Sequence, residues 1–183
     1  EMIMDPMDIA YVIEKAYHLA ITGRPGPCWI DIPLDIQGAM IETDELKHFM
    51  PEDSESNEMT DEELDAIADK VIDRFVSSDR PVLYAGNGIR LSGCVDQFHK
   101  LVETMQIPVV TCWDSIDLMA TDDDLYCGRG GNMGDRAGNF AVQNSDFLLC
   151  IGTRLNIYQV GFDVNTWARE AYIVVDDIDP EEL

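Results

Sequence analysis

The sequence predicts an α/β fold, with a parallel β-sheet that carries helices on both faces. Short, fully apolar runs alternate with amphipathic helical segments over residues 60–183. Runs of this kind are typical of parallel strands, which are buried on both faces of their sheet. The 46% hydrophobic content of the 183 residues suits a globular chain and is too high for wholesale disorder.

The first part of the chain predicts one helix, a Gly/Pro loop and one strand. Asp5 can cap the helix and Pro6 suits its first position, after which apolar residues recur at helical spacing over 9–20. The glycines and prolines of residues 23–27 end this helix, and a strand is expected at 28–32. Because one helix and one strand cannot close a core, we expect this piece to pack on something else.

The formal charge of −24 is concentrated in one segment. Residues 42–65 hold eleven Asp or Glu against one lysine, Lys47, and the stretch from 47 to 59 has no regular apolar period. We therefore expect a solvated acidic linker at 42–59. The acidic balance argues against nucleic acid and against anionic membrane surfaces as partners, because Lys and Arg bind both. No apolar run approaches the ~20 residues of a membrane span.

The sequence has five cysteines, an odd number, and no two of them form a C-x-x-C pair. Three of them lie in or beside apolar runs, where a free thiol behaves as a small hydrophobic group. This usage fits a reducing cytosol, so we expect a cytoplasmic protein without disulfides and without a cysteine-based metal site.

The second part of the chain predicts regular alternation of helices and strands. Thr60 and Glu63 form a capping box for a helix that reaches Phe75. Further helices are expected at 95–105 and around 140–142. Strands are expected at 81–85, 108–112, 147–151 and 171–175, and loops at 114–135 and 152–165.

Ligands bind parallel sheets at the carboxyl ends of the strands, and three predicted strand ends here carry glycine or polar residues. These are residues 86–88, 111–115 and 152–154. The turn Gly86-Asn87-Gly88 would let backbone N–H groups approach a phosphate, and a tight structural turn is the alternative. The glycine-rich run at 128–134 leads into a helix and could face an anion, with a surface loop as the alternative.

Several of these segments resemble thiamine-diphosphate enzymes of the acetolactate-synthase type. The motif T-G-R-P-G-P at 22–27, followed by D-I-P at 31–33, is similar to the end of that family's pyrimidine-binding domain. The segments similar to its central domain lie at 80–86, 107–111, 152–154 and 177–180. The resemblance implies three parts: the last helix and strand of the preceding domain (1–41), the acidic linker (42–59), and a Rossmann-like central domain (60–183). It also implies a chain truncated at both ends.

The resemblance implies a multidomain transferase or lyase that decarboxylates 2-oxo acids and joins the products. Thiamine diphosphate with magnesium would carry this chemistry, held by the missing N- and C-terminal catalytic domains of the same chain. The family's G-D-G signature for the diphosphate and magnesium does not occur in this sequence. We expect a homodimer or homotetramer for the parent, and a largely structural role, without catalytic residues, for this inactive segment.

The resemblance also implies a nucleotide site, because the central domain holds FAD in some members and an adenine nucleotide such as ADP in others. Carried over by position, the lining residues would be Gly86, Gly88, Thr111, Gly131, Asn132, Met133, Gly134, Gly152, Arg154 and Asp177. Arg154 would bind the diphosphate bidentately, with a structural ion pair as its alternative. Asp177 would contact the ribose or the adenine, with a solvated turn acid as its alternative. Residues 155–159 and the motif G-N-M-G at 131–134 depart from the pattern of the flavin-binding members.

Two other functions stay open on the sequence alone. One is a free-standing nucleotide-binding module for FAD, ADP or NAD, based on the glycine-bearing strand ends and on Arg154. The other is a metal-dependent hydrolase that would use the acidic residues at 122–124 or the cluster at Asp176, and it requires ligands that converge in space.

Overall fold

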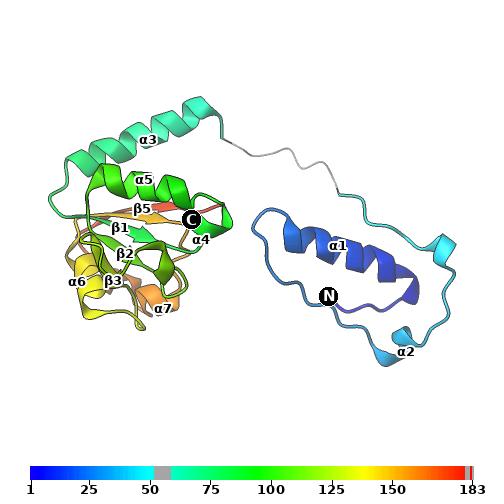
Figure 1. Ribbon diagram of the computed structural model, residues 1–183. Helices are drawn as coiled ribbons and strands as arrows, with labels where there is room; N and C mark the ends of the chain where they lie inside the picture. Colours follow the sequence, from blue (N-terminus) through cyan, green and yellow to red (C-terminus); the bar gives the residue numbers. More distant parts are fainter. Residues whose placement is uncertain (52–58, 180–181, 183) are drawn as a thin grey trace. The chain divides into compact units, whose positions relative to one another are not determined.

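The computed structural model describes residues 1–51, 59–179 and 182. The chain forms two compact units, Glu1–Glu58 and Met59–Leu183, which are described separately (Figure 1). Part of the predicted linker, residues 52–58, lies outside the described residues. Within the described part of the chain, no helix has both the length and the apolar character that a membrane crossing requires.

The N-terminal unit is built around α1 (Ile9–Ile21). A 3-10 turn at Pro6–Asp8 precedes α1, and the Asp5 carboxylate caps this turn by accepting a hydrogen bond from a backbone N–H, as the sequence predicts. Two short pieces follow, α2 (Leu34–Gln37) and η2 (Thr43–Glu45).

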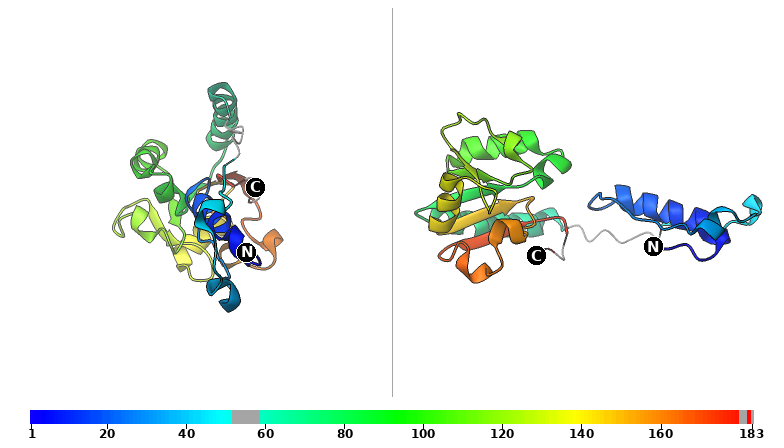
Figure 2. Two further views of the ribbon diagram at one scale, coloured as in Figure 1. Left: turned by 90° about the vertical axis from the view of Figure 1, so that its right-hand side faces the viewer. Right: turned by 90° about the horizontal axis from the view of Figure 1, so that it is seen from below.

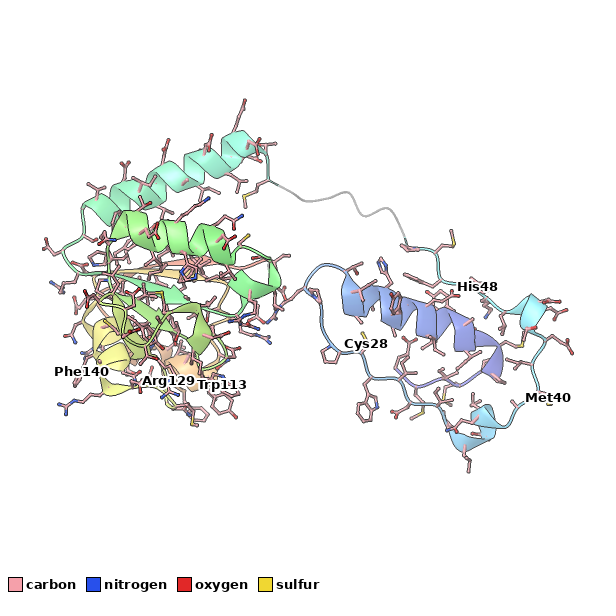
Figure 3. All side chains as sticks on the ribbon, viewed as in Figure 1. Cys28, Met40, His48, Trp113, Arg129 and Phe140 are labelled. Carbon is pink, nitrogen blue, oxygen red and sulfur yellow. The ribbon has the colours of Figure 1, made fainter. Side chains whose placement is uncertain are left out.

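The strand predicted at 28–32 is reduced to a single parallel bridge between Asp31 and Met2. The first residues of the chain lie beside this segment, and among the described residues it pairs with no longer strand. Large apolar side chains of the unit are exposed, among them Tyr17, Trp29, Leu34 and Met40. Figure 3 shows Cys28 and His48 close to α1, and His48 pairs with the carboxylate of Glu14.

The second unit contains a five-stranded parallel sheet in the order β3-β2-β1-β4-β5 (Figure 1). Its strands are β1 (Pro81–Ala85), β2 (Val109–Thr111), β3 (Tyr126–Arg129), β4 (Phe147–Ile151) and β5 (Tyr172–Asp176). In the centre of the sheet, Leu83 of β1 lies in register with Val109 of β2 and with Leu149 of β4. The predicted α/β class with a parallel sheet is confirmed.

Helices cover both faces of this sheet (Figures 1 and 2). They are α3 (Asp61–Val76), α4 (Gly88–Leu91), α5 (Val95–Met105), α6 (Arg136–Asn144) and α7 (Ile157–Val160), with 3-10 turns at Ile116–Leu118 and Val164–Thr166. In Figure 1, α3 and α5 lie over one face, and α6 and α7 lie over the other. The predicted capping box starts α3, since Thr60 and Glu63 each accept from the backbone N–H of the other.

Each face of the sheet has its own hydrophobic core, because side chains alternate along a strand. On one face, Leu83 and Ala85 of β1 pack with Phe98 of α5. On the other face, Val82 and Tyr84 of β1 pack with Val142 of α6. Burial on both sides explains why β1 is apolar at every position.

Three elements lie entirely within segments that the sequence predicted as loops: β3 and the 3-10 turn η3 (Ile116–Leu118) within 114–135, and α7 within 152–165. The strand β3 contains Gly128 and Arg129 and is only partly buried at the sheet edge, so it lacks the apolar run that marks the other strands. The helix α7 has four residues, which is too short for a helical period to be visible in the sequence.

Candidate functional site

The strand order reverses between β1 and β4, and this switch point is where open parallel sheets bind ligands. The chain goes from β1 outward to β2 and β3, then returns to place β4 on the other side of β1. The turn at 86–88 follows β1, and Gly152 follows β4. Three of the predicted site residues therefore lie together at the carboxyl end of the central strands.

The glycines at this switch point allow the two turns to approach each other closely. The backbone N–H of Gly88 donates to the carbonyl of Gly152 (2.9 Å), and that of Gly86 donates to Ile151 (2.9 Å). A Cβ on Gly86 would lie 2.2 Å from the Gly152 carbonyl oxygen. Gly152 itself has a φ of +59°, and a Cβ there would lie 2.7 Å from the Ile89 nitrogen. This geometry is that of the tight structural turn.

Three backbone N–H groups of the glycine-rich loop between β3 and α6 donate hydrogen bonds to acceptors within the chain. The N–H of Gly131 donates to the side-chain oxygen of Asn139 (2.9 Å). The N–H of Asn132 donates to the carbonyl of Tyr158 (2.8 Å), and that of Gly134 donates to the carbonyl of Gly131 (3.0 Å). The loop is thus tied to α6 by Asn139 and to α7 by Tyr158.

Arg129 and Asp135 join the two ends of this loop. The Arg129 guanidinium donates two hydrogen bonds to the Asp135 carboxylate (3.0 and 3.1 Å), and the Arg129 backbone N–H donates a third (2.9 Å). These bonds lower the pKa of Asp135 to about 2. Asp135 is the N-cap residue of α6, and its carboxylate faces Arg129.

Asp135→Asn is expected to destabilise the second unit at neutral pH, because it removes the charged partner of Arg129. The native pKa of Asp135 is depressed, so its stabilising effect is present above its ordinary value of 3.8 and is lost as the pH falls through about 2. The difference in free energy of unfolding between the wild type and this variant should therefore shrink between pH 4 and pH 2. Urea unfolding across this range measures it.

The matched control is Asp122→Asn, which removes a carboxylate from an exposed turn. We expect this control to leave the free energy of unfolding nearly unchanged at every pH. A difference between wild type and Asp135→Asn that stays constant from pH 7 to pH 2 would contradict the assigned role of the Asp135 carboxylate.

The remaining predicted polar residues also have partners within the chain. Thr111 is fully buried and its hydroxyl bonds to the hydroxyl of Tyr126 (3.0 Å). Arg154 forms an ion pair with Glu182, and the Asp177 carboxylate accepts from the N–H of Asp179 (3.0 Å). These are the contacts of a structural ion pair and of a turn acid.

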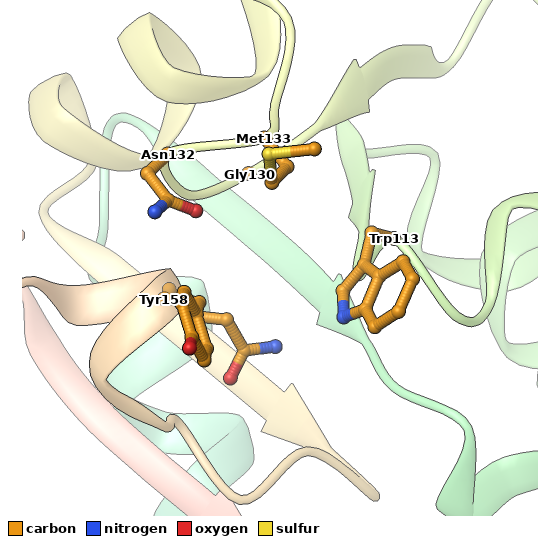
Figure 4. Close-up of a pocket in the computed structure, with 6 residues that line it drawn as sticks. Trp113, Gly130, Asn132, Met133 and Tyr158 are labelled. Atoms are coloured by element: carbon orange, nitrogen blue, oxygen red, sulfur yellow. The ribbon is translucent and has the colours of Figure 1, made fainter.

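A pocket of about 150 Å³ lies beside the glycine-rich loop (Figure 4). Its lining residues are Trp113, Gly130, Asn132, Met133, Tyr158 and Gln159. Trp113 stands on one side of the pocket and Tyr158 on the other, and their side chains are 60% and 62% exposed. Of the ten predicted site residues, only Asn132 and Met133 line this pocket.

A cluster of buried polar side chains lies next to the pocket. The Gln159 side chain, 7% exposed, donates to the Thr153 hydroxyl (3.0 Å), which in turn contacts the Cys112 thiol (3.1 Å). The hydroxyl of Tyr84 is fully buried beside Cys112 and makes no hydrogen bond of ordinary geometry to the described residues. Burial raises the pKa of Cys112 to about 11 and the pKa of Tyr84 above its usual range. Both groups are therefore protonated at neutral pH and are unsuited to act as nucleophiles.

Sequence reasoning missed Trp113, Tyr158 and Gln159 as individual site residues. Trp113 falls in the strand end at 111–115, but nothing in the sequence singles it out. One signal was present for α7: Asn156 is followed three residues later by Gln159, which is the capping-box pattern. Both hydrogen bonds of this capping box are present in the structure, so the sequence pattern could have located the short helix.

The acidic residues proposed for a metal-dependent hydrolase do not converge. In residues 1–51, 59–179 and 182 there is no group of three or more His, Cys, Asp or Glu side chains that could hold a metal ion. The carboxylates at 122–124 are exposed. The hydrolase alternative has no support in this part of the chain.

Comparison with known proteins agrees with the fold. The family model described as "Thiamine pyrophosphate enzyme, central domain" matches residues 68–183. The acetolactate synthase large subunit of Lactococcus lactis is 34% identical over 99% of this chain, and that of Corynebacterium glutamicum is 32% identical over all of it. The probable acetolactate synthase 2 of Oryza sativa, a chloroplastic protein, is 37% identical over the whole chain.

The chain spans only 27–31% of the length of these three relatives. The comparisons give no support to a free-standing nucleotide-binding module, whereas they confirm the resemblance that the sequence motifs indicated. A family model that covers most of the chain, together with a five-stranded parallel sheet in the same residues, settles the assignment. The chain belongs to the thiamine pyrophosphate enzyme family, and its residues 68–183 match the central domain of that family.

Proposed function

We propose that this chain is the middle portion of an acetolactate-synthase-type transferase that, as a full-length protein, decarboxylates a 2-oxo acid and joins the product to a second one. The observation that carries the proposal is the similarity to proteins named acetolactate synthase, which runs along the whole chain at 32–37% identity. The product named by these relatives has the carbon skeleton of two pyruvate molecules less one carbon dioxide, so pyruvate is the proposed substrate.

We propose that magnesium accompanies thiamine diphosphate in the full-length protein, and that domains outside this chain hold both. Membership of the family supports the thiamine cofactor. This chain covers 31% and 28% of the length of two of its relatives, which supports placing the cofactor on the remainder of the protein. FAD and ADP are left out of the proposal, because the glycine turns, Thr111, Arg154 and Asp177, which were predicted to bind them, have partners within the chain.

We further propose that residues 1–41 are the last part of the preceding pyrimidine-binding domain. Residues 42–59 are then the linker between the two domains, and residues 60–183 form the central domain. The division into units at Glu58 and Met59 supports this arrangement. The predicted site residues then have a structural role: they shape the turns that join β1, β3 and β4 to the helices that follow. A cytoplasmic homodimer or homotetramer is part of the same proposal.

The test is the conversion of pyruvate by the full-length protein, with and without thiamine diphosphate and magnesium. We expect acetolactate to form only when both cofactors are present, and this 183-residue chain alone to form none. Because this chain is expected to be structural, its failure to act alone does not count against the proposal.

A further inference from the structure

We infer that this domain closes its own nucleotide crevice: α7 and the strand-end turns occupy the positions that a dinucleotide would use, and Gln159 holds α7 in place. The consequence is that FAD, ADP and NAD do not bind at the switch point between β1 and β4. The inference rests on contacts within the chain and does not depend on the reaction of the full-length protein.

The first observation is that four N–H groups of the glycine turns, which could hold a diphosphate, already have acceptors. A phosphate at a parallel sheet is bound by the free N–H groups of glycine turns and of helix N-termini. After β1, the N–H groups of Gly86 and Gly88 donate to carbonyls at the end of β4. In the glycine-rich loop, Asn132 donates to Tyr158 of α7, and Gly131 donates to Asn139 of α6.

The second observation is that the space beside these glycines is filled by protein backbone. A glycine at a dinucleotide site leaves room for the pyrophosphate to approach the backbone. Here a Cβ on Gly131 would lie 2.5 Å from the Tyr158 carbonyl oxygen, and a Cβ on Gly88 would lie 2.6 Å from the Gly152 Cα. The pocket beside the glycine-rich loop, at about 150 Å³, has the size of a cavity that holds one benzene-sized ring, whereas pockets for drug-sized ligands measure ~300–1,000 Å³.

The third observation concerns charge. The guanidinium groups of Arg90 and Arg154, which follow β1 and β4, are paired with the carboxylates of Asp117 and Glu182. At the end of β5, burial and then the neighbouring carboxylate of Asp177 raise the pKa of Asp176. A diphosphate would therefore meet neutralised arginines and acidic side chains, so its binding is not favoured.

Gln159 connects α7 to the sheet. Its amide donates to the Thr153 hydroxyl and to the Cys112 thiol, and its carbonyl oxygen accepts from the Asn156 N–H (2.9 Å). Thr153 follows β4 and Cys112 follows β2, so one buried side chain holds the helix between two strand ends. The adjacent Tyr158 carbonyl is thereby fixed as the acceptor for the glycine-rich loop.

The first arm of the test uses the whole 183-residue chain without substitution. FAD, ADP and NAD are each added to 1 mM, and binding is followed by isothermal titration calorimetry and by the midpoint of thermal unfolding. We expect no binding heat and a shift of the midpoint below ~1 °C. A dissociation constant below ~100 μM for any of the three nucleotides, with a midpoint raised by several degrees, would overturn the inference.

The second arm measures amide hydrogen exchange of Asn132 in the nucleotide-free chain. We expect this amide to exchange at least ~100-fold more slowly than an unstructured one, because Tyr158 accepts its hydrogen bond. Gln159→Met keeps the side-chain length and removes the amide, and should accelerate this exchange ~10-fold or more. The control Gln97→Met, on an exposed position of α5, should leave it unchanged.

An unprotected Asn132 amide in the wild type would contradict the closure, and equal exchange in Gln159→Met and Gln97→Met would contradict the role of Gln159. If Gln159→Met does not fold, the titration and the exchange of the wild-type chain still decide whether the crevice is closed.

Discussion

Replacing Gly152 with alanine is expected to destabilise the second unit by about 3 kcal/mol, for two reasons that add. The residue has a φ of +59°, where a Cβ costs ~1–2 kcal/mol. The new Cβ would also lie 2.7 Å from the Ile89 nitrogen and 2.8 Å from the Gly88 Cα, and neither backbone atom can move without opening the contact between β1 and β4. Urea unfolding gives the change in free energy.

Gly93→Ala separates the two causes. Gly93 has a similar φ of +73°, but no heavy atom lies within 4 Å of the position its Cβ would take. This variant should lose only the ~1–2 kcal/mol of the unfavourable φ. Equal losses in the free energy of unfolding for the two variants would show that the strand-end turns do not pack closely. The structural role of the glycines at the switch point would then be wrong.

Phe147→Ala is expected to cost about 3–5 kcal/mol, the range for removing a fully buried aromatic ring. Phe147 begins β4, is 1% exposed, and its ring centre lies 6.0 Å from that of Phe75 in α3. Its loss should leave a cavity between the sheet and α3. We expect α3 amides to lose protection from hydrogen exchange, beyond the fall in the free energy of unfolding.

The control for this prediction is Phe162→Ala, which truncates a ring that is 95% exposed. It should change the free energy of unfolding by no more than ~0.5 kcal/mol. Comparable losses for Phe147→Ala and Phe162→Ala would contradict the assignment of Phe147 to the hydrophobic core under α3.

Much of the fold could be predicted because both faces of the central strands are buried. The runs at 81–85 and 147–151 are apolar at every position, and they became β1 and β4 with the predicted bounds. The edge strand β3 carries Gly128 and Arg129 and is partly exposed, so its sequence does not differ from that of a loop. The segment at 28–32 has strand-forming residues, but in the part of the chain that the structure describes it pairs only through the bridge to Met2, so propensity alone predicted too long a strand.

The candidate site could be predicted only in part, because its contacts join residues far apart in the chain. The glycine turns after β1 and β4 were located correctly, but the sequence does not show that they pack against each other. Arg154 lies 28 residues from its partner Glu182, and the sequence offers many other carboxylates. Gln159 reaches Cys112 over 47 residues, a contact that depends on the strand order of the folded sheet.

The decisive measurement of the proposed function is acetolactate formation by the full-length protein. The protein that contains this chain is incubated with pyruvate, after removal of thiamine diphosphate and magnesium and again after their return. We expect no product without the cofactors, and acetolactate and carbon dioxide in equal amounts when they are restored. A full-length protein that binds no thiamine diphosphate, or that forms no product from any 2-oxo acid in its presence, would overturn the proposed function.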